Sequence, residues 1–127
     1  MNLKLHLLAI AAHPDDIELS CAGTLIKHVN AGQSVGILDL TQGELGTRGS
    51  AELRLLEAQA AAKVMGVEVR ENAGMADGFF RNDEEHQRTL IQLFVRLQLC
   101  KEGINEPLTL LLGMRGHAPC NSNKCKK

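Results

Sequence analysis

Apolar residues are grouped along the chain in short continuous runs that alternate with stretches of helical periodicity. The first run, residues 3–12, is almost entirely apolar and is too short for a typical helix, a pattern that favours a strand buried on both faces of a parallel sheet. In residues 17–31 the apolar positions recur every fourth residue, and Gly32 follows where a helix end is expected. The chain is therefore predicted to begin with a strand, a loop and a helix.

The same unit is repeated further along the chain. After residue 31 the predicted elements are a strand at 34–40, a helix at 51–65 that ends at Gly66, a strand at 67–70 and a helix that begins near Asp83. Alternating strands and helices of these lengths indicate right-handed crossovers. We therefore predict an α/β fold, a Rossmann-like three-layer sandwich around a mostly parallel sheet.

The pattern weakens after about residue 96. Residues 1–100 are predicted to form the N-terminal part of one α/β domain, and residues 101–127 an atypical tail. Within the tail, residues 108–112 are predicted to form one strand and the remainder is expected to be disordered. We therefore expect a domain that is truncated relative to a complete fold of this class.

Composition and charge argue against nucleic-acid-binding and membrane-spanning classes of protein. The formal net charge is −1, and the chain has three Phe, no Trp and no Tyr. Neither general attraction to nucleic acid nor aromatic stacking of bases is indicated, and no apolar run approaches the ~20 residues that span a bilayer. The apolar N-terminal run leads into His-Pro-Asp-Asp without a signal-peptide cleavage pattern, so we expect a cytoplasmic protein with a small-molecule ligand.

The segment of greatest chemical interest joins the first predicted strand to the first predicted helix. His13 and Asp16 are three residues apart across a turn stiffened by Pro14, so an imidazole nitrogen and a carboxylate oxygen could meet at one cation. Asp15 lies between them, where a carboxylate could act as a general base. Glu18, one turn into the helix, could hold the loop through hydrogen bonds.

The same residues also suit a purely structural role. An Asp before a helix is a common N-cap, and His-Pro is a common turn dipeptide. Two ligands are also fewer than the three that a catalytic zinc usually has. The spacing alone therefore leaves both interpretations open.

A family resemblance favours the catalytic interpretation. The segment AHPDDIELSCAGTL resembles the signature of the PIG-L/LmbE deacetylases, and later segments around TQGELGTRGS and ENAGMADGFF are also similar, over residues 3–90 in all. The resemblance implies that His13 and Asp16 bind Zn²⁺, or another divalent metal, and that Asp15 is the catalytic base. It implies metal-dependent hydrolysis of the N-acetyl group of an N-acetylglucosaminyl conjugate.

Within that family, DLTQGELGTRGS followed by Glu-Leu-Arg is similar to the bacillithiol branch, which deacetylates N-acetylglucosaminyl malate. The resemblance implies that Arg54 contacts the substrate, and Arg48 is a second candidate, because a guanidinium group pairs well with a carboxylate. Alternatively, Arg54 pairs with a nearby Glu on an exposed helix face and Arg48 lies at a solvated loop tip.

The chain departs from the family pattern in its last part. The family's second motif, close to His-Pro-Asp-His, supplies the third zinc ligand and an oxyanion stabiliser. The nearest segment here is RGHAP, in which His117 is the candidate third ligand. His117 could equally be solvent-exposed, or it could bind a stray metal together with Cys120 and Cys125.

The sequence is compatible with two functions from different classes. The first is a zinc-dependent N-acetyl-sugar deacetylase. The second is an inactive, truncated remnant that acts only by associating with itself or with a partner through an exposed sheet edge or apolar face. A homo-oligomer is compatible with either.

Overall fold

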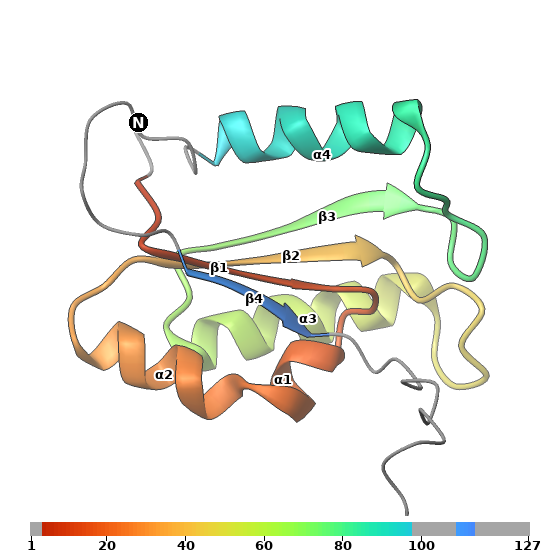
Figure 1. The fold of residues 1–127 in the computed structure, drawn as a ribbon. Helices are drawn as coiled ribbons and strands as arrows, with labels where there is room; N and C mark the ends of the chain where they lie inside the picture. The colour runs from red at the N-terminus through yellow and green to blue at the C-terminus, as the bar shows by residue number, and fades with distance from the viewer. Residues whose placement is uncertain (1–3, 98–108, 114–127) are drawn as a thin grey trace, which may run out of the picture.

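A four-stranded parallel sheet forms the middle layer of the protein (Figure 1). The computed structural model describes residues 4–97 and 109–113. The strands are β1 (Leu7–Ala11), β2 (Val35–Thr41), β3 (Val69–Met75) and β4 (Thr109–Gly113), and their order across the sheet is β3-β2-β1-β4. The predicted parallel α/β architecture is confirmed.

Helices cover both faces of this sheet. Figure 1 shows α1 (Asp16–Ser20), α2 (Ala22–Asn30) and α3 (Ala51–Met65) on one face and α4 (Glu84–Arg96) on the other. These are the outer layers of the predicted three-layer sandwich. Within the described residues, no helix has both the length and the apolar character needed to cross a membrane.

The core consists of two apolar clusters, one on each face of the sheet. All five residues of β1 are buried. Successive side chains on a strand point to opposite faces, so Leu8 and Ile10 join the cluster under α4, whereas Leu7 and Ala9 join the cluster under α2 and α3. The continuous apolar run in the sequence therefore reflects burial of β1 on both sides.

The boundaries of the two long helices follow from local capping. The hydroxyl of Ser50 accepts a hydrogen bond from the amide of Leu53, and Gly66 ends α3 with a φ of 74°. The Asp83 carboxylate caps α4 by accepting from the amide of His86. Both helices lie where the sequence predicts them.

Two elements differ from the prediction. The single helix predicted for residues 17–31 is divided at Cys21 into α1 and α2, although Ile17 and Leu25 on either side of the break still pack in the same cluster. The strand predicted at residues 67–70 begins later and extends to Met75, through polar residues that the sequence suggested were a loop. Polar residues are accommodated in β3 because it is an edge strand that pairs only with β2 among the described strands.

A strand lies at Thr109–Gly113, close to the predicted range of 108–112, and it pairs with β1 from Leu7↔Thr109 to Ala11↔Gly113. The division into a domain at 1–100 and a tail at 101–127 stays a prediction, because most of the second range lies outside the described residues.

The strand order places a topological switch point at β1. The chain proceeds outward from β1 to β2 and β3 and then returns to the other side of β1 with β4. Ligands of open α/β sheets bind beyond the carboxyl ends of the strands at such a point. The loop that follows β1 is therefore in the position expected of a ligand site.

Candidate active site

Three segments meet at the carboxyl edge of the sheet. They are the loop after β1, the glycine-rich loop after β2 and the turn after β3. The hydroxyl and amide of Thr41 both donate to the carbonyl of Ala12, which joins the end of β2 to the loop after β1. Together with the first residue of α1 and Arg54 of α3, these segments form a pocket of about 420 Å³, lined by His13, Asp15, Asp16, Leu45, Gly46, Arg54 and Asp77.

His13 and Asp16 lie together in this pocket, as their spacing predicts. Nδ1 of His13 is 3.4 Å from Oδ2 of Asp16, and the same oxygen accepts a hydrogen bond of 3.1 Å from the His13 amide. Asp16 is 5% exposed, whereas the His13 side chain is 40% exposed. A buried carboxylate and an accessible imidazole therefore face the same small volume.

This geometry fits a divalent cation. Two ligand atoms that each lie ~2.1 Å from a tetrahedral zinc are separated by about 3.4 Å, and the His13 and Asp16 atoms are separated by 3.4 Å. Nitrogen and carboxylate oxygen are also the ligand types that zinc accepts. Residues 4–97 contain no group of three His, Cys, Asp or Glu side chains that could complete such a site. The candidate third ligand, His117, lies outside the described residues.

Asp15 is more accessible than its two neighbours. Its side chain is 55% exposed, and Oδ2 lies 3.5 Å from Nη2 of Arg54. Arg54 also donates from Nη1 to the carbonyl of Gly43 at 3.0 Å. Gly43 has a φ of +65°, and a Cβ there would lie 2.0 Å from the Arg54 guanidinium, so only glycine allows this approach. Arg54 thus links α3, the loop after β2 and Asp15.

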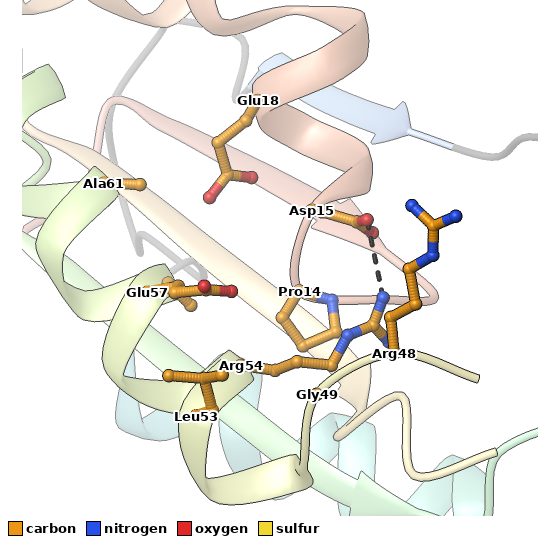
Figure 2. Close-up of a pocket in the computed structure, with 10 residues that line it drawn as sticks. Pro14, Asp15, Glu18, Arg48, Gly49, Leu53, Arg54, Glu57 and Ala61 are labelled. Atoms are coloured by element: carbon orange, nitrogen blue, oxygen red, sulfur yellow. Dashed lines mark ion pairs between the residues drawn. The ribbon is translucent and has the colours of Figure 1, made fainter. Parts of the chain in front are cut away.

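A second pocket of about 440 Å³ adjoins the first and shares Asp15 and Arg54 with it. Figure 2 shows Arg54 reaching from α3 to Asp15, with Arg48 on the neighbouring loop. Arg48 is exposed. The remaining lining residues are Pro14, Glu18, Gly49, Leu53, Glu57, Ala58 and Ala61. We call this the side pocket.

Glu18 holds the loop through a partner that sequence reasoning missed. Arg70 on β3, whose side chain is 1% exposed, pairs with Glu18 at 2.5 Å and with Asp39 at 2.7 Å. It also donates to the carbonyls of Pro14 and Ala58. Glu18 therefore contacts the loop indirectly: it pairs with the buried Arg70, which in turn donates to the carbonyl of Pro14, between His13 and Asp15.

Burial affects the protonation of this network. It raises the pKa of Asp39 from 3.8 to about 6, although the hydrogen bonds and the charge of Arg70 act in the opposite direction. Because the pKa is higher in the folded state, the stabilisation linked to this carboxyl is fully present below about pH 4 and is lost as the pH rises through about 6.

We therefore expect the free energy of unfolding of the unmodified protein, relative to that of an Asp39→Asn variant, to fall between about pH 4 and about pH 6. The amide of the variant does not titrate, so the difference isolates the carboxyl. Urea unfolding of both proteins across this range measures the effect. A difference that stays flat, or that increases with pH, would contradict it.

Asp77, in the turn after β3, is the second residue that the sequence analysis did not select. It is 7% exposed, and its Oδ1 lies 2.8 Å from Nε2 of His13. Burial opposes ionisation, but hydrogen bonds from His13 and from the Leu45 amide hold the pKa of Asp77 below its ordinary value. The only signal in the sequence was an Asp-Gly pair, which is also typical of an ordinary turn.

Comparisons with known proteins show the family of this chain. The sequence profile of the family described as "PIG-L: GlcNAc-PI de-N-acetylase" matches residues 8–101. The chain belongs to this family. An uncharacterised deacetylase, YaiS of Escherichia coli K12, is 36% identical to it over 76 residues, which are 60% of this chain and 40% of YaiS.

Solved structures of this family's fold are also similar. The conserved protein TT1542 from Thermus thermophilus matches with a TM-score of 0.69 and 44% identity, over 73% of this chain and 42% of that protein. The N,N'-diacetylchitobiose deacetylase from Pyrococcus horikoshii matches with a TM-score of 0.67 and 26% identity, over 72% of this chain and 37% of the enzyme. The present chain thus corresponds to less than half of the length of each of these three relatives.

Proposed function

We propose that this chain provides the catalytic segment of a zinc-dependent deacetylase that hydrolyses the N-acetyl group of an N-acetylglucosaminyl conjugate. The observation that carries the proposal is the convergence of His13 and Asp16 at a spacing suited to zinc, with the exposed carboxylate of Asp15 in the same pocket. The family match and the deacetylases among the relatives support the reaction class.

His13 and Asp16 would hold the metal. When bound, zinc acts as a Lewis acid toward water and the acetyl carbonyl. Asp15 takes a proton from the attacking water as the new C–O bond forms, and it returns that proton to the departing nitrogen as the C–N bond breaks. Acetate and a free amino sugar are the products. Asp15 suits this role because its side chain is 55% exposed and lines both pockets.

Arg70 and Arg54 support the reacting groups. Arg70 fixes the Pro14 carbonyl, and therefore the backbone between His13 and Asp15. Arg54 donates to Gly43 and lies 3.5 Å from Asp15, which limits the directions that the Asp15 carboxylate can take. Holding a base in a productive orientation contributes directly to the rate.

We propose N-acetylglucosaminyl malate as the substrate, with the malate in the side pocket. Arg48 is exposed there, and a guanidinium group binds a carboxylate through two parallel hydrogen bonds. Arg54 also lines this pocket, but part of its donor set is already used by Gly43 and Asp15. Arg48 is therefore the stronger candidate for recognition of the malate.

The test compares two substrates on the zinc-loaded protein. Release of acetate is measured with N-acetylglucosaminyl malate and with the neutral disaccharide N,N'-diacetylchitobiose. Arg48→Ala should raise KM for the malate conjugate about 10-fold or more and leave the disaccharide nearly unaffected. Equal effects on both substrates would refute the malate assignment, and absence of acetate release from either would refute the deacetylase.

The second candidate is the inactive remnant that associates with itself or with a partner. It is favoured by large apolar side chains that are exposed on α3 and α4, among them Val64 at 87% and Val95 at 63%. Size-exclusion chromatography with light scattering, combined with zinc content and acetate release, distinguishes the two functions. Self-association without zinc binding or acetate release would support the remnant.

A further inference from the structure

His13 is held on both of its ring nitrogens. Nε2 is 2.8 Å from Oδ1 of Asp77, and Nδ1 is 3.4 Å from Oδ2 of Asp16. The imidazole is 40% exposed, so packing alone does not fix its orientation. The two carboxylates, Asp16 at the start of α1 and Asp77 in the turn after β3, therefore hold the ring from two sides.

Asp77 is itself anchored by the loop after β2. Its Oδ2 accepts a hydrogen bond of 3.2 Å from the Leu45 amide, and its own amide donates to Oε1 of Glu44 at 2.7 Å. The two loops are thus joined by reciprocal contacts between backbone and carboxylate. Because the Asp77 side chain is 8% exposed, this anchor leaves little freedom to the oxygen that faces His13.

The contact with Asp77 determines which nitrogen of His13 carries a hydrogen. An ionised carboxylate only accepts hydrogen bonds, so the 2.8 Å contact requires a hydrogen on Nε2. In the neutral imidazole, Nδ1 is then an unprotonated lone pair. That lone pair lies beside a second acceptor, Asp16, at the separation of two ligands of one zinc ion.

We infer that Asp77 is a positioning residue that orients His13 and keeps its hydrogen on Nε2, so that Nδ1 faces a divalent cation together with Asp16. This inference rests on the proposed metal-dependent function. A carboxylate behind a metal-binding histidine fixes the ring and increases its basicity, and its loss typically weakens metal binding 10- to 100-fold.

The test measures zinc affinity by competition with a chelator for the unmodified chain, Asp77→Ala and Asp77→Asn. We expect Asp77→Ala to weaken zinc binding about 10- to 100-fold. Asp77→Asn should have a smaller effect, because the amide oxygen still accepts a hydrogen bond. Asp83→Ala is the matched control, since Asp83 also contacts a histidine, His86 at 2.6 Å, but does so at the start of α4. Circular dichroism establishes that each variant is folded.

A second measurement does not depend on the metal. In ¹H–¹⁵N spectra of the metal-free chain, the hydrogen on Nε2 of His13 should be visible, because its hydrogen bond to Asp77 slows exchange with water. The signal should disappear in Asp77→Ala and persist in Asp83→Ala. If Asp77→Ala does not fold, Asp77→Asn replaces it. A changed signal of the His13 Nε2 hydrogen in Asp77→Asn would then support the inference, and an unchanged signal would contradict it.

The outcomes separate the inference from the function on which it rests. If the unmodified chain binds zinc and Asp77→Ala binds it equally well with an unchanged His13 signal, the inference is wrong and the proposed function stands. If the folded, unmodified chain does not bind zinc, the metal-dependent function itself is overturned, and the inference with it. Weaker zinc binding together with loss of the signal in Asp77→Ala alone would support the inference.

Discussion

If the proposed function holds, an Asp15→Asn variant is expected to bind zinc normally and to lose most of the proposed deacetylase turnover, whereas His13→Ala should lose the zinc. Asp15 is not one of the proposed ligands, and an asparagine of the same shape cannot accept the proton from water. General base catalysis of this kind contributes a factor of about 10² to 10⁴, so kcat should fall by that factor. His13 supplies one of only two proposed ligands in the described residues, and its removal leaves a single carboxylate.

The measurement is zinc content per chain after removal and restoration of the metal, made beside the rate of acetate release. His6→Ala is a suitable control, because His6 bonds Ser34 near the start of β1, at the opposite end of that strand from the pocket. Equal zinc content and equal activity in the Asp15 and His13 variants would contradict the assigned roles. Zinc retained by His13→Ala would place the metal elsewhere.

Arg70→Met is expected to lower the free energy of unfolding by about 3–5 kcal/mol, which is the usual cost of removing one partner of a buried ion pair. The substitution leaves Asp39, which is 2% exposed, without its cation. It also removes the donors to the Pro14 and Ala58 carbonyls. Because a whole domain is stable by only about 5–15 kcal/mol, this single change should bring the protein close to unfolding.

Urea unfolding at neutral pH measures this effect. Arg88→Met is the matched control, because Arg88 forms an ion pair with Glu84 in which the side chains are 72% and 78% exposed, and such a pair contributes less than about 1 kcal/mol. Adding Asp39→Leu to Arg70→Met should recover part of the loss, since it removes the buried charge that was left unpaired. Similar effects of the Arg70 and Arg88 substitutions would contradict the role assigned to the buried network.

The sequence predicted those elements of the fold that local patterns determine. The apolar run of β1, the helical spacing of α2 and the capping residues Ser50 and Asp83 each act within a few positions, so the sequence shows them directly. The extent of β3 could not be predicted in this way. Its polar residues resemble a loop, and only pairing with β2 makes them a strand.

The residues of the candidate site also fall into two groups: those that the sequence alone indicates and those that only the fold brings together. His13, Asp15 and Asp16 lie in one short segment, so their spacing and the family resemblance were sufficient to select them. Asp77 and Arg70 act on that segment from β3 and the turn that follows it, 64 and 56 positions away from their partners in sequence. Their roles follow from the parallel order of the strands, which brings separate turns to one edge of the sheet.

The position of β4 has a consequence for how the chain reaches its folded state. β1 precedes β4 in the chain and is apolar on both faces, and one of its two hydrogen-bonding edges is completed only by Thr109–Gly113. Until that late segment is available, β1 presents an open, apolar edge of the kind that pairs with other chains. Loop closure over this length of chain is also slow. Aggregation during synthesis should therefore compete with folding at β1, the strand that precedes the candidate site.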